Sequence, residues 1–375
     1  MNEIISFPGL GLEFSIDRVA FTLFGKPIYW YGVIIAVGFL LAVVYTMRRV
    51  KEFGLDSDRV IDVLLGSVVT GMIGARIYYV VFSWDMYKNN PIDVFKIWNG
   101  GIAIYGGVIG ALLGGWLFCR LRRVKFLPMC DLCAAGLMLA QGIGRWGNFV
   151  NGEAFGSATN LPWRMVSTYE GGAGMTKMQS YLASLPEETL SALGENVGVH
   201  PTFFYESTWC ILGFFFLMWL TSRRRFDGEL ILAYAAWYGA ERAVVEGLRT
   251  DSLMLGNLRI SQFVAVITCL TALVLLFMIR SRIRRSNDPE YRKLYVHTEE
   301  AEQIRQGTFY QKKAKAGKGE GLEEKAAEEQ GDKAAGASEE AETEVKDPSK
   351  EAAGEVPGDG NAEEAGAEDA SKTEQ

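Results

Sequence analysis

ISQFVAVITCLTALVLLFMI, residues 260–279, is a run of 20 amino acids without a single charged residue. An α-helix rises about 1.5 Å per residue, so about 20 apolar residues are enough to cross the hydrocarbon core of a bilayer. This run therefore predicts a membrane-spanning helix, and it defines the pattern to look for in the rest of the chain.

The same pattern recurs along the first three quarters of the chain. Two further segments, Pro27–Met47 and Ile97–Cys119, contain no charge either. Four more are long and apolar enough if a few charged residues are tolerated: 60–82, 129–150, 203–221 and 229–247. The sequence thus predicts an all-α polytopic membrane protein with seven transmembrane helices.

The loops between these segments differ in their content of lysine and arginine. The segments 47–59, 120–128, 222–229 and 280–285 carry 4, 4, 3 and 4 basic residues, fifteen in all, whereas the alternate segments carry two each, eight in all. Cytoplasmic loops of membrane proteins are the basic ones. The bias predicts an outer N-terminus and a cytoplasmic C-terminus, with 157–202 as an outer loop in which 175–193 forms a short amphipathic helix on the membrane surface.

The composition changes after residue 285. Residues 1–285 contain 26 Lys+Arg and 21 Asp+Glu, a net charge of +5, and residues 286–375 contain 12 and 24, a net charge of −12, which together give the −7 of the whole chain. A segment so charged and so poor in large apolar residues cannot bury a core. We therefore expect two parts, a transmembrane domain over 1–285 and a disordered, acidic cytoplasmic tail over 286–375 that transfer chemistry does not need.

Metal and redox chemistry find little support in the sequence. The chain has two histidines, and its five cysteines lie in or beside apolar segments. Cys130 and Cys133 form a C-x-x-C pair, but further zinc ligands and a soluble redox context are missing nearby. We expect ordinary apolar cysteines, no metal, no cofactor and no nucleic-acid partner.

Each of the seven predicted spans places polar residues in the half that the basic bias puts outside. An ionisable side chain in hydrocarbon is costly, so such residues indicate function and should face a cavity. Helical spacing places several of them on common faces. The residues are Tyr31, Arg76, Tyr105, Gln141, Arg145, Asn148, Glu206, Tyr238, Arg242, Glu246, Ser261 and Gln262.

Three arginines of this set, Arg76, Arg145 and Arg242, suggest the ligand. The planar guanidinium fork suits phosphate oxygens. Buried ion pairs that join helices are the simpler alternative, but the facing helices offer few carboxylates for three arginines. The pattern favours a phospholipid-headgroup site that is open to the outer leaflet.

One motif around Arg145 is specific. GRWGNFVNGEAFG, residues 144–156, resembles the signature G-R-x-G-N-F-x-N-x-E-x-x-G of prolipoprotein diacylglyceryl transferases, with every fixed position filled. The resemblance covers about residues 18–285. Other matching segments follow in the family's order: 30–32, 74–76, 98–101, His200-Pro201, Tyr205-Glu206, Tyr238–Arg242 with Glu246 and Arg249, and Ser261-Gln262.

The resemblance implies an enzyme that moves the diacylglyceryl group of phosphatidylglycerol, a membrane lipid, to the lipobox cysteine of a prolipoprotein and releases glycerol 1-phosphate. The family's phosphate-binding arginine corresponds to Arg145, its essential tyrosine and arginine to Tyr238 and Arg242, and its tyrosine near the start of the first helix to Tyr31. We expect Arg145 and Arg242 to bind the phosphate and Tyr238 to donate a hydrogen bond near the reacting centre. Further substrate contacts are expected from Asn148, Asn151, Glu153, Tyr31, Arg76, Tyr105, Glu206 and Glu246.

The sequence departs from the family at one position of interest. Many members have a histidine, regarded as a possible base, where this chain has Tyr105. A phenol with a pKa near about 10 is a poor base at neutral pH. Glu206, Glu246 and His200 remain open as candidates for the general base.

A lipid transporter or flippase with an outer-leaflet headgroup site is the main alternative function. Such a protein would show internal repeats and polar groups near the middle of the membrane. The sequence shows no convincing repeat, and its polar residues favour one half of the spans, so the transferase is preferred.

Overall fold

The computed structural model describes residues 2–172, 174–194, 196–250, 254–255, 258–286, 288 and 290–310. The segment 311–375, which holds most of the predicted acidic tail, lies outside the described residues. The first of the chain's two units, Met1–Lys312, contains every element discussed below.

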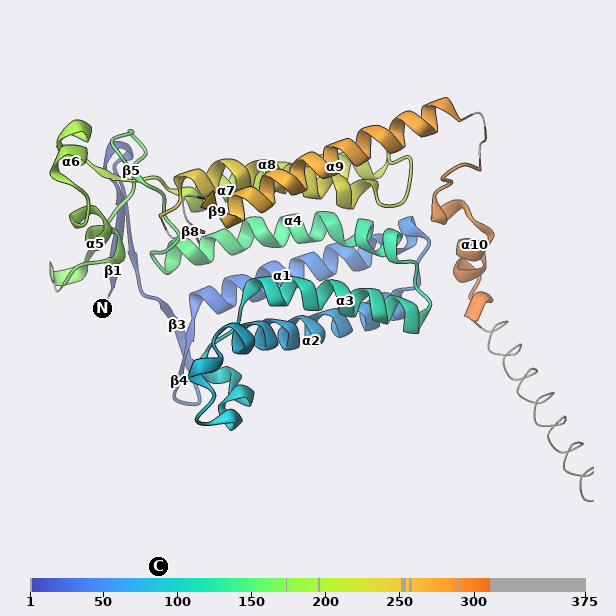
Figure 1. Ribbon diagram of the computed structural model, residues 1–375, viewed down its shortest axis with the longest axis horizontal. Helices are drawn as coiled ribbons and strands as arrows, with labels where there is room; N and C mark the ends of the chain where they lie inside the picture. Colours follow the sequence, from blue (N-terminus) through green and yellow to red (C-terminus); the bar gives the residue numbers. More distant parts are fainter. Residues whose placement is uncertain are drawn as a thin grey trace, which may run out of the picture. The chain divides into compact units, whose positions relative to one another are not determined.

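Long helices dominate this unit and run side by side (Figure 1). Among them α1 packs with α4, α2 with α3, α4 with α7 and α8 with α9. Their bounds are α1 Trp30–Arg49, α2 Ser57–Phe82, α3 Ile104–Arg122, α4 Phe126–Val150, α7 Thr202–Thr221, α8 Glu229–Leu248 and α9 Ile260–Arg285.

Among the described residues, six helical segments are long and apolar enough to cross a membrane. They are Trp30–Phe53, Ser57–Phe82, Ile104–Arg122, Phe126–Val150, Thr202–Thr221 and Ile260–Arg285. The prediction of a helical, multi-pass membrane protein is confirmed. Helix α8 has 20 residues but includes Glu229, Glu241, Arg242 and Glu246, and these charges separate it from the other six.

The start of α8 is fixed by a carboxylate from another helix. Asp131, which is 1% exposed in α4, accepts hydrogen bonds from the backbone N–H groups of Gly228 (2.8 Å) and Ile231 (2.9 Å). The first N–H groups of a helix have no partner within it, and a carboxylate at this end also suits the helix dipole. Asp131 therefore sets the position of α8 relative to α4.

Helices α2 and α3 approach each other closely because glycines line their contact. A methyl group on Gly74 would lie 2.5 Å from the Gly106 carbonyl oxygen, and one on Gly110 would lie 2.4 Å from the Thr70 carbonyl oxygen. Real side chains do not tolerate such distances. Small residues at these positions let the two backbones touch, as is common in membrane helices.

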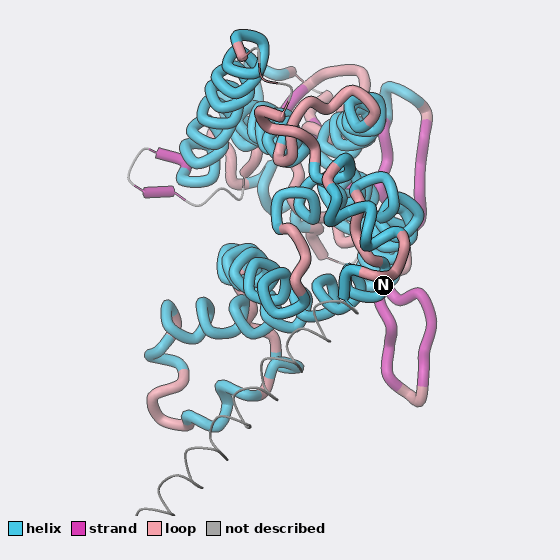
Figure 2. Tube along the Cα trace, turned by 90° about the vertical axis from the view of Figure 1, so that its right-hand side faces the viewer, coloured by secondary structure: helices cyan, strands magenta, loops and turns pink. Residues whose placement is uncertain are grey.

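Short strands and helices gather at one end of the long helices, opposite α10 (Glu299–Arg305) (Figure 1). An antiparallel sheet has the order β2 (Leu12–Ile16), β1 (Glu3–Phe7), β6 (Val166–Tyr169). Figure 2 shows the strands, in magenta, as short paired segments beside the helices. The remaining pairs are β3 (Val19–Leu23) with β4 (Lys26–Tyr29), β5 (Ala158–Thr159) with β7 (Gly198–Val199), and β8 (Met254–Leu255) with β9 (Leu258–Arg259).

The single amphipathic helix predicted over 175–193 is two helices, α5 (Lys177–Ala183) and α6 (Glu187–Leu193). Pro186 is the N-cap residue of α6, and a proline prevents one helix from continuing into the next. Met178 of α5 is 1% exposed and packs in a core with residues of β1 and α7. The Met178 side chain therefore attaches α5 to the rest of the protein.

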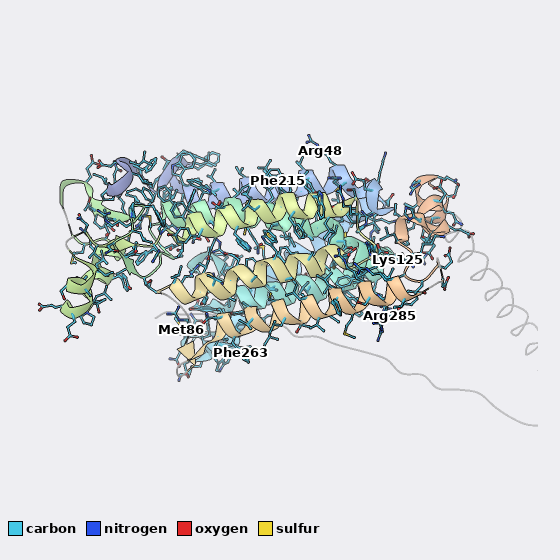
Figure 3. The ribbon with its side chains drawn as sticks, turned by 90° about the horizontal axis from the view of Figure 1, so that it is seen from above. Arg48, Met86, Lys125, Phe215, Phe263 and Arg285 are labelled. Carbon is cyan, nitrogen blue, oxygen red and sulfur yellow. The ribbon has the colours of Figure 1, made fainter. Side chains whose placement is uncertain are left out.

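The opposite end of the bundle, which we call the basic end, carries the arginine-rich and lysine-rich loops. Figure 3 places Arg48, Lys125 and Arg285 at this end and Met86 at the other. This agrees with the alternation of basic and non-basic loops along the sequence.

Part of the predicted disordered tail is folded onto the basic end, so that prediction is wrong for residues 290–310. Tyr295, Ile304 and Phe309 are at most 8% exposed and belong to the same core as Val50 and Phe53. These large apolar side chains are exceptions in a segment that is otherwise acidic and polar. Their removal from water stabilises the folded form of residues 290–310.

Two further contacts attach this segment to neighbouring loops. The Arg59 guanidinium lies 3.4 Å from the centre of the Tyr310 ring, and Lys125 forms a 2.8 Å ion pair with Glu300. Residues 290–310 thus close the basic end of the helices.

Truncation should distinguish these residues from the acidic segment that follows. Ending the chain after Arg285 exposes core side chains at the basic end, and we expect the melting temperature in detergent to fall by about 5–10 °C. Ending it after Tyr310 should leave the melting temperature within about 1 °C of the full chain. Equal melting temperatures for both truncations would contradict a stabilising role of 290–310.

Candidate active site

Glu206, in the first turns of α7, is the centre of a buried ionic cluster at the end of the helices opposite the basic end. Its side chain is 1% exposed. One carboxylate oxygen lies 2.5 Å from Arg145 Nε of α4, and the other lies 3.1 Å from Arg242 Nη1 of α8 and 3.6 Å from Arg249 Nη1. One carboxylate thus holds three cations from separate segments.

Arg242 extends the cluster along α8. Its Nη2 lies 2.5 Å from a carboxylate oxygen of Glu246, one helical turn further on. Arg259, at the end of β9, donates to the backbone carbonyl of Glu246. These contacts fix the guanidinium of Arg242 on both sides and tie the end of α8 to the start of α9.

Arg145 is held differently, with only part of its guanidinium engaged. Its guanidinium approaches Glu206 through Nε, and the hydrogen bonds among the described residues include none that Nη1 or Nη2 donates. The neighbouring Trp146 donates from its indole to the Ser207 hydroxyl at 3.1 Å, which fixes α4 against α7. The terminal fork of Arg145 is therefore positioned but available to a ligand.

Tyr238 lies one turn before Arg242 on α8. Its ring stacks on that of Tyr234 with the centres 6.0 Å apart and the planes 10° from parallel. The charged groups that act on the Tyr238 hydroxyl include Arg145 and Arg242. Arg145, Tyr238 and Arg242 therefore lie in one neighbourhood of the structure.

A second group of predicted residues follows α4. Asn151 donates to Glu153 at 3.2 Å and Asn148 donates to the same carboxylate oxygen at 3.5 Å, while Lys177 of α5 donates to the other oxygen at 3.3 Å. Tyr31 packs close to Gly147, where a methyl group would lie 2.9 Å from its ring.

These residues adjoin an open cavity of about 600 Å³. Tyr31 and Asn151 line it together with Arg18 and Lys177. One amide side chain, the two phenols of Tyr29 and Tyr31, and two cations make this cavity suitable for a hydroxylated or anionic headgroup.

An apolar pocket of about 370 Å³ is lined by residues of α4 and α7 together with residues of β1 and β2. Trp146, Phe149, Phe203 and Tyr205 line it, so it adjoins the residues next to Arg145 and Glu206. The surface of this pocket is entirely apolar, so the pocket suits a hydrocarbon group.

Arg76 is not brought into the ionic cluster. Its guanidinium donates at 2.7 Å to the backbone carbonyls of Val94, Gly100, Gly101 and Asp93, and its side chain is buried. All three nitrogens are thereby used to hold the loop between α2 and α3, so Arg76 supports the structure around the site.

Tyr105 also lies apart from the cluster. Its hydroxyl hydrogen-bonds the Ser261 hydroxyl at 2.8 Å and so joins α3 to α9. Gln262, the next residue, donates to the Ala243 carbonyl at 2.8 Å and joins α9 to α8.

The candidates for the general base differ in their surroundings. Glu206 and Glu246 are both occupied by ion pairs with arginines. His200 shares a 3.2 Å hydrogen bond between Nδ1 and the Tyr205 hydroxyl, and burial lowers its pKa, so it is neutral at pH 7.

Sequence reasoning assigned no role to Glu241, which the structure places among the same charges. It is 4% exposed, and the charged groups acting on it are Glu206, Arg145, Arg242 and Arg249. A signal was present in the sequence, because Glu241 is a charged residue inside a predicted span and directly precedes Arg242.

Comparison with known proteins identifies the family of the chain. A family model described as prolipoprotein diacylglyceryl transferase matches residues 18–278. Proteins with the name phosphatidylglycerol--prolipoprotein diacylglyceryl transferase are similar over most of their length. The chain is 40% identical over 252 residues to that of Clostridioides difficile (strain 630), covering 67% of this chain and 91% of the relative.

Two other relatives give the same result. Identity is 41% over 275 residues to the protein of Staphylococcus haemolyticus (strain JCSC1435), covering 72% of this chain and 91% of the relative. It is 37% over 274 residues to that of Finegoldia magna, covering 73% of this chain and 100% of the relative. The chain belongs to the prolipoprotein diacylglyceryl transferase family.

Proposed function

We propose that this chain transfers the diacylglyceryl group of phosphatidylglycerol to the lipobox cysteine thiol of prolipoproteins, forming a thioether and releasing glycerol 1-phosphate. The observation that carries the proposal is the buried cluster in which Glu206 holds Arg145 and Arg242. The cluster lies within the part of the chain that matches the family. It offers fixed positive charge where a phosphate ester must leave.

The arginines have separate tasks in this reaction. The terminal fork of Arg145 binds the phosphate oxygens of the lipid, and Arg242 adds a second fixed charge. In a site that excludes water, such preorganised charges stabilise a leaving phosphate strongly. Glu206 and Glu246 are positioning residues that keep the guanidinium groups in place, and Tyr238 donates a hydrogen bond at the reacting centre.

The glycerol headgroup and the acyl chains occupy different surroundings. The group of Asn148, Asn151 and Glu153 binds the headgroup hydroxyls from the polar cavity that Tyr31 lines. The apolar pocket beside Trp146 receives a hydrocarbon part of one substrate. Arg76 and Tyr105 act indirectly, by holding a loop and a helix pair.

We assign seven membrane spans, with α8 as the sixth. Its charges have partners inside the protein, since Arg242 pairs with two carboxylates and Glu229 pairs with Arg280 of α9. Paired charges inside a bundle are compatible with a membrane span. The basic end faces the cytoplasm. The N-terminus therefore lies outside, and the host membrane is the bacterial cell (inner) membrane.

Thiol labelling tests this orientation. Thr189 in α6 and Glu299 in α10 are exposed and lie at opposite ends of the helices. In intact spheroplasts, an impermeant thiol reagent should modify the Thr189→Cys variant and not Glu299→Cys, while both should react after permeabilisation. Labelling of Glu299→Cys alone in intact spheroplasts would reverse the assigned topology.

Direct transfer tests the activity and separates it from lipid flipping, the alternative function. Purified protein in vesicles is given phosphatidylglycerol labelled in its acyl chains and a lipobox peptide. Label should appear on the cysteine peptide and not on a control peptide with serine in place of cysteine. Movement of the labelled lipid between leaflets without any labelled peptide would favour the flippase instead.

A further inference from the structure

Glu241 differs from the other buried carboxylates of the ionic cluster in having no hydrogen-bond partner among the residues that the structure describes. Both of its carboxylate oxygens are inaccessible to solvent, and no donor within the described residues reaches either one. Burying a carboxylate without a donor is unfavourable, so such a group in a native protein requires an explanation.

A second buried glutamate on the same helix shows what a structural carboxylate looks like here. Glu229 is 0% exposed at the start of α8, and it accepts hydrogen bonds from the Arg280 guanidinium and the Arg225 backbone N–H. Glu229 is satisfied by the protein itself. Glu241, three turns further on, is not.

The surroundings of Glu241 are those of the proposed reaction. Three arginines act on it from three segments: Arg145 from α4, Arg242 from α8, and Arg249 from the residues after α8. The other groups near it are Glu206 and Cys210 of α7 and Tyr234 and Tyr238 of α8. Both carboxylate oxygens of Glu241 lack a donor among the described residues and are therefore left as acceptors for a donor that the substrate brings.

The proposed function needs such an acceptor, and three of the other candidates already have partners. A cysteine thiol has a pKa near about 8.5 and is mostly protonated at neutral pH, whereas the thiolate is the nucleophile. Tyr105 is hydrogen-bonded to Ser261, and Glu206 and Glu246 are held by arginines.

We propose that Glu241 is the general base of the transfer reaction, an inference that rests on the proposed function. The lipobox thiol gives its proton to a Glu241 carboxylate oxygen. The sulfur then forms a bond to the glyceryl carbon, the bond between that carbon and the phosphate oxygen breaks, and the electron pair leaves with glycerol 1-phosphate. The proton returns to water or to the product phosphate before the next cycle.

The charges of the cluster fit this sequence of events. With Glu241 ionised, three arginines (Arg145, Arg242, Arg249) face three carboxylates (Glu206, Glu241, Glu246), and the sum is 3 − 3 = 0. Protonation of Glu241 changes the sum to +1. That positive charge arises as the phosphodiester, with one negative charge, becomes a monoester with up to two.

The test compares Glu241→Gln with Glu229→Gln, a buried carboxylate of the same helix outside the site. We measure kcat, the KM for phosphatidylglycerol and the melting temperature from pH 6 to 9.5. For Glu241→Gln we expect kcat at pH 7 to fall by about 10²–10⁴-fold, the loss typical of a missing general base, with little change in KM. The loss should shrink as the pH passes the thiol pKa of about 8.5.

An acceptor that is already ionised should bypass the missing base. A selenocysteine in place of the lipobox cysteine is deprotonated at neutral pH, so Glu241→Gln should approach the wild-type rate with this peptide. Glu241→Asp, which keeps the carboxylate, should retain the wild-type pH profile at a lower rate. Glu229→Gln should have a lower melting temperature but the wild-type pH profile.

Other results would overturn the assignment. A loss in Glu241→Gln that does not change with pH and is not relieved by selenocysteine would show a structural role. If His200→Gln shows the pH-dependent loss of kcat and Glu241→Gln has a kcat near that of the wild type, His200 is the general base. Absence of transfer by the wild-type protein would overturn the proposed function itself, whereas a failure of Glu241 alone leaves wild-type transfer intact.

Discussion

Replacing Arg145 with lysine is expected to lower the transfer rate by about 10²-fold or more, comparable to removing one donor from an oxyanion site. Lysine keeps the positive charge but loses the planar fork that binds two phosphate oxygens. In the structure Nε of Arg145 is used by Glu206 and the fork is left to the ligand, so both features of the side chain matter. The measurements are kcat and melting temperature for Arg145→Lys and Arg145→Ala in one detergent.

The alanine variant should be slower still. Arg242→Lys should lose activity to a similar extent, and also stability, because Arg242 pairs with both Glu206 and Glu246. If Arg145 and Arg242 were only structural ion pairs, both lysine variants would transfer at near-normal rates. Unchanged turnover in the alanine variants would exclude this site altogether.

Replacing Glu206 with alanine is expected to produce the largest loss of stability. Its removal leaves Arg145, Arg242 and Arg249 partly buried side by side without their shared carboxylate. Breaking a buried ion pair by deleting one partner typically costs about 3–5 kcal/mol. For a chain of this size we expect the melting temperature to fall by about 10 °C, with transfer abolished because the arginines repel one another out of position.

An exposed pair provides the control for this measurement. Glu302 pairs with Arg305 at 3.0 Å near the end of the described chain, and both side chains are about half exposed. Glu302→Ala should shift the melting temperature by at most 1–2 °C, since exposed ion pairs contribute about 0–1 kcal/mol. Equal shifts for the two alanine variants would contradict the central position of Glu206.

The ionic cluster could be anticipated from the sequence because its residues violate the apolar pattern of the spans. Glu206, Arg145 and Arg242 are charges in segments that are otherwise hydrocarbon-like, and helical spacing places Tyr238 and Glu246 with Arg242. Which carboxylate pairs with which arginine depends on how α4, α7 and α8 are rotated against each other. Periodicity within one helix does not contain that information.

Residues that act through the backbone could not be anticipated in the same way. Arg76 matched the pattern of a phosphate-binding arginine, yet its donors are taken by carbonyl groups of the loop after α2. Every residue has a carbonyl, so no side-chain pattern reveals such a partner. Glu241 stood out in the sequence only as a charged residue inside a predicted span, and the sequence could not show that its carboxylate has no donor among the described residues.

Average composition was misleading for the start of the tail. Residues 286–375 are acidic as a whole, but Tyr295, Ile304 and Phe309 supply enough apolar surface to fold residues 290–310 onto the basic end. A local cluster of large apolar side chains can fold a short stretch even when the average composition of the whole segment predicts disorder. The N-terminal strands were missed because each is at most five residues long and pairs with distant or equally short partners.

The most direct test of the account quantifies both products of one reaction. Purified protein, phosphatidylglycerol and a lipobox peptide are incubated, and the peptide thioether and free glycerol 1-phosphate are measured together by mass spectrometry. The account predicts that wild-type protein forms the two products in a one-to-one ratio and that Arg145→Lys forms both about 10²-fold more slowly in the same ratio. Glycerol 1-phosphate without thioether, or thioether formation that Arg145→Lys leaves unchanged, would contradict the assignment of the arginine cluster to the leaving phosphate.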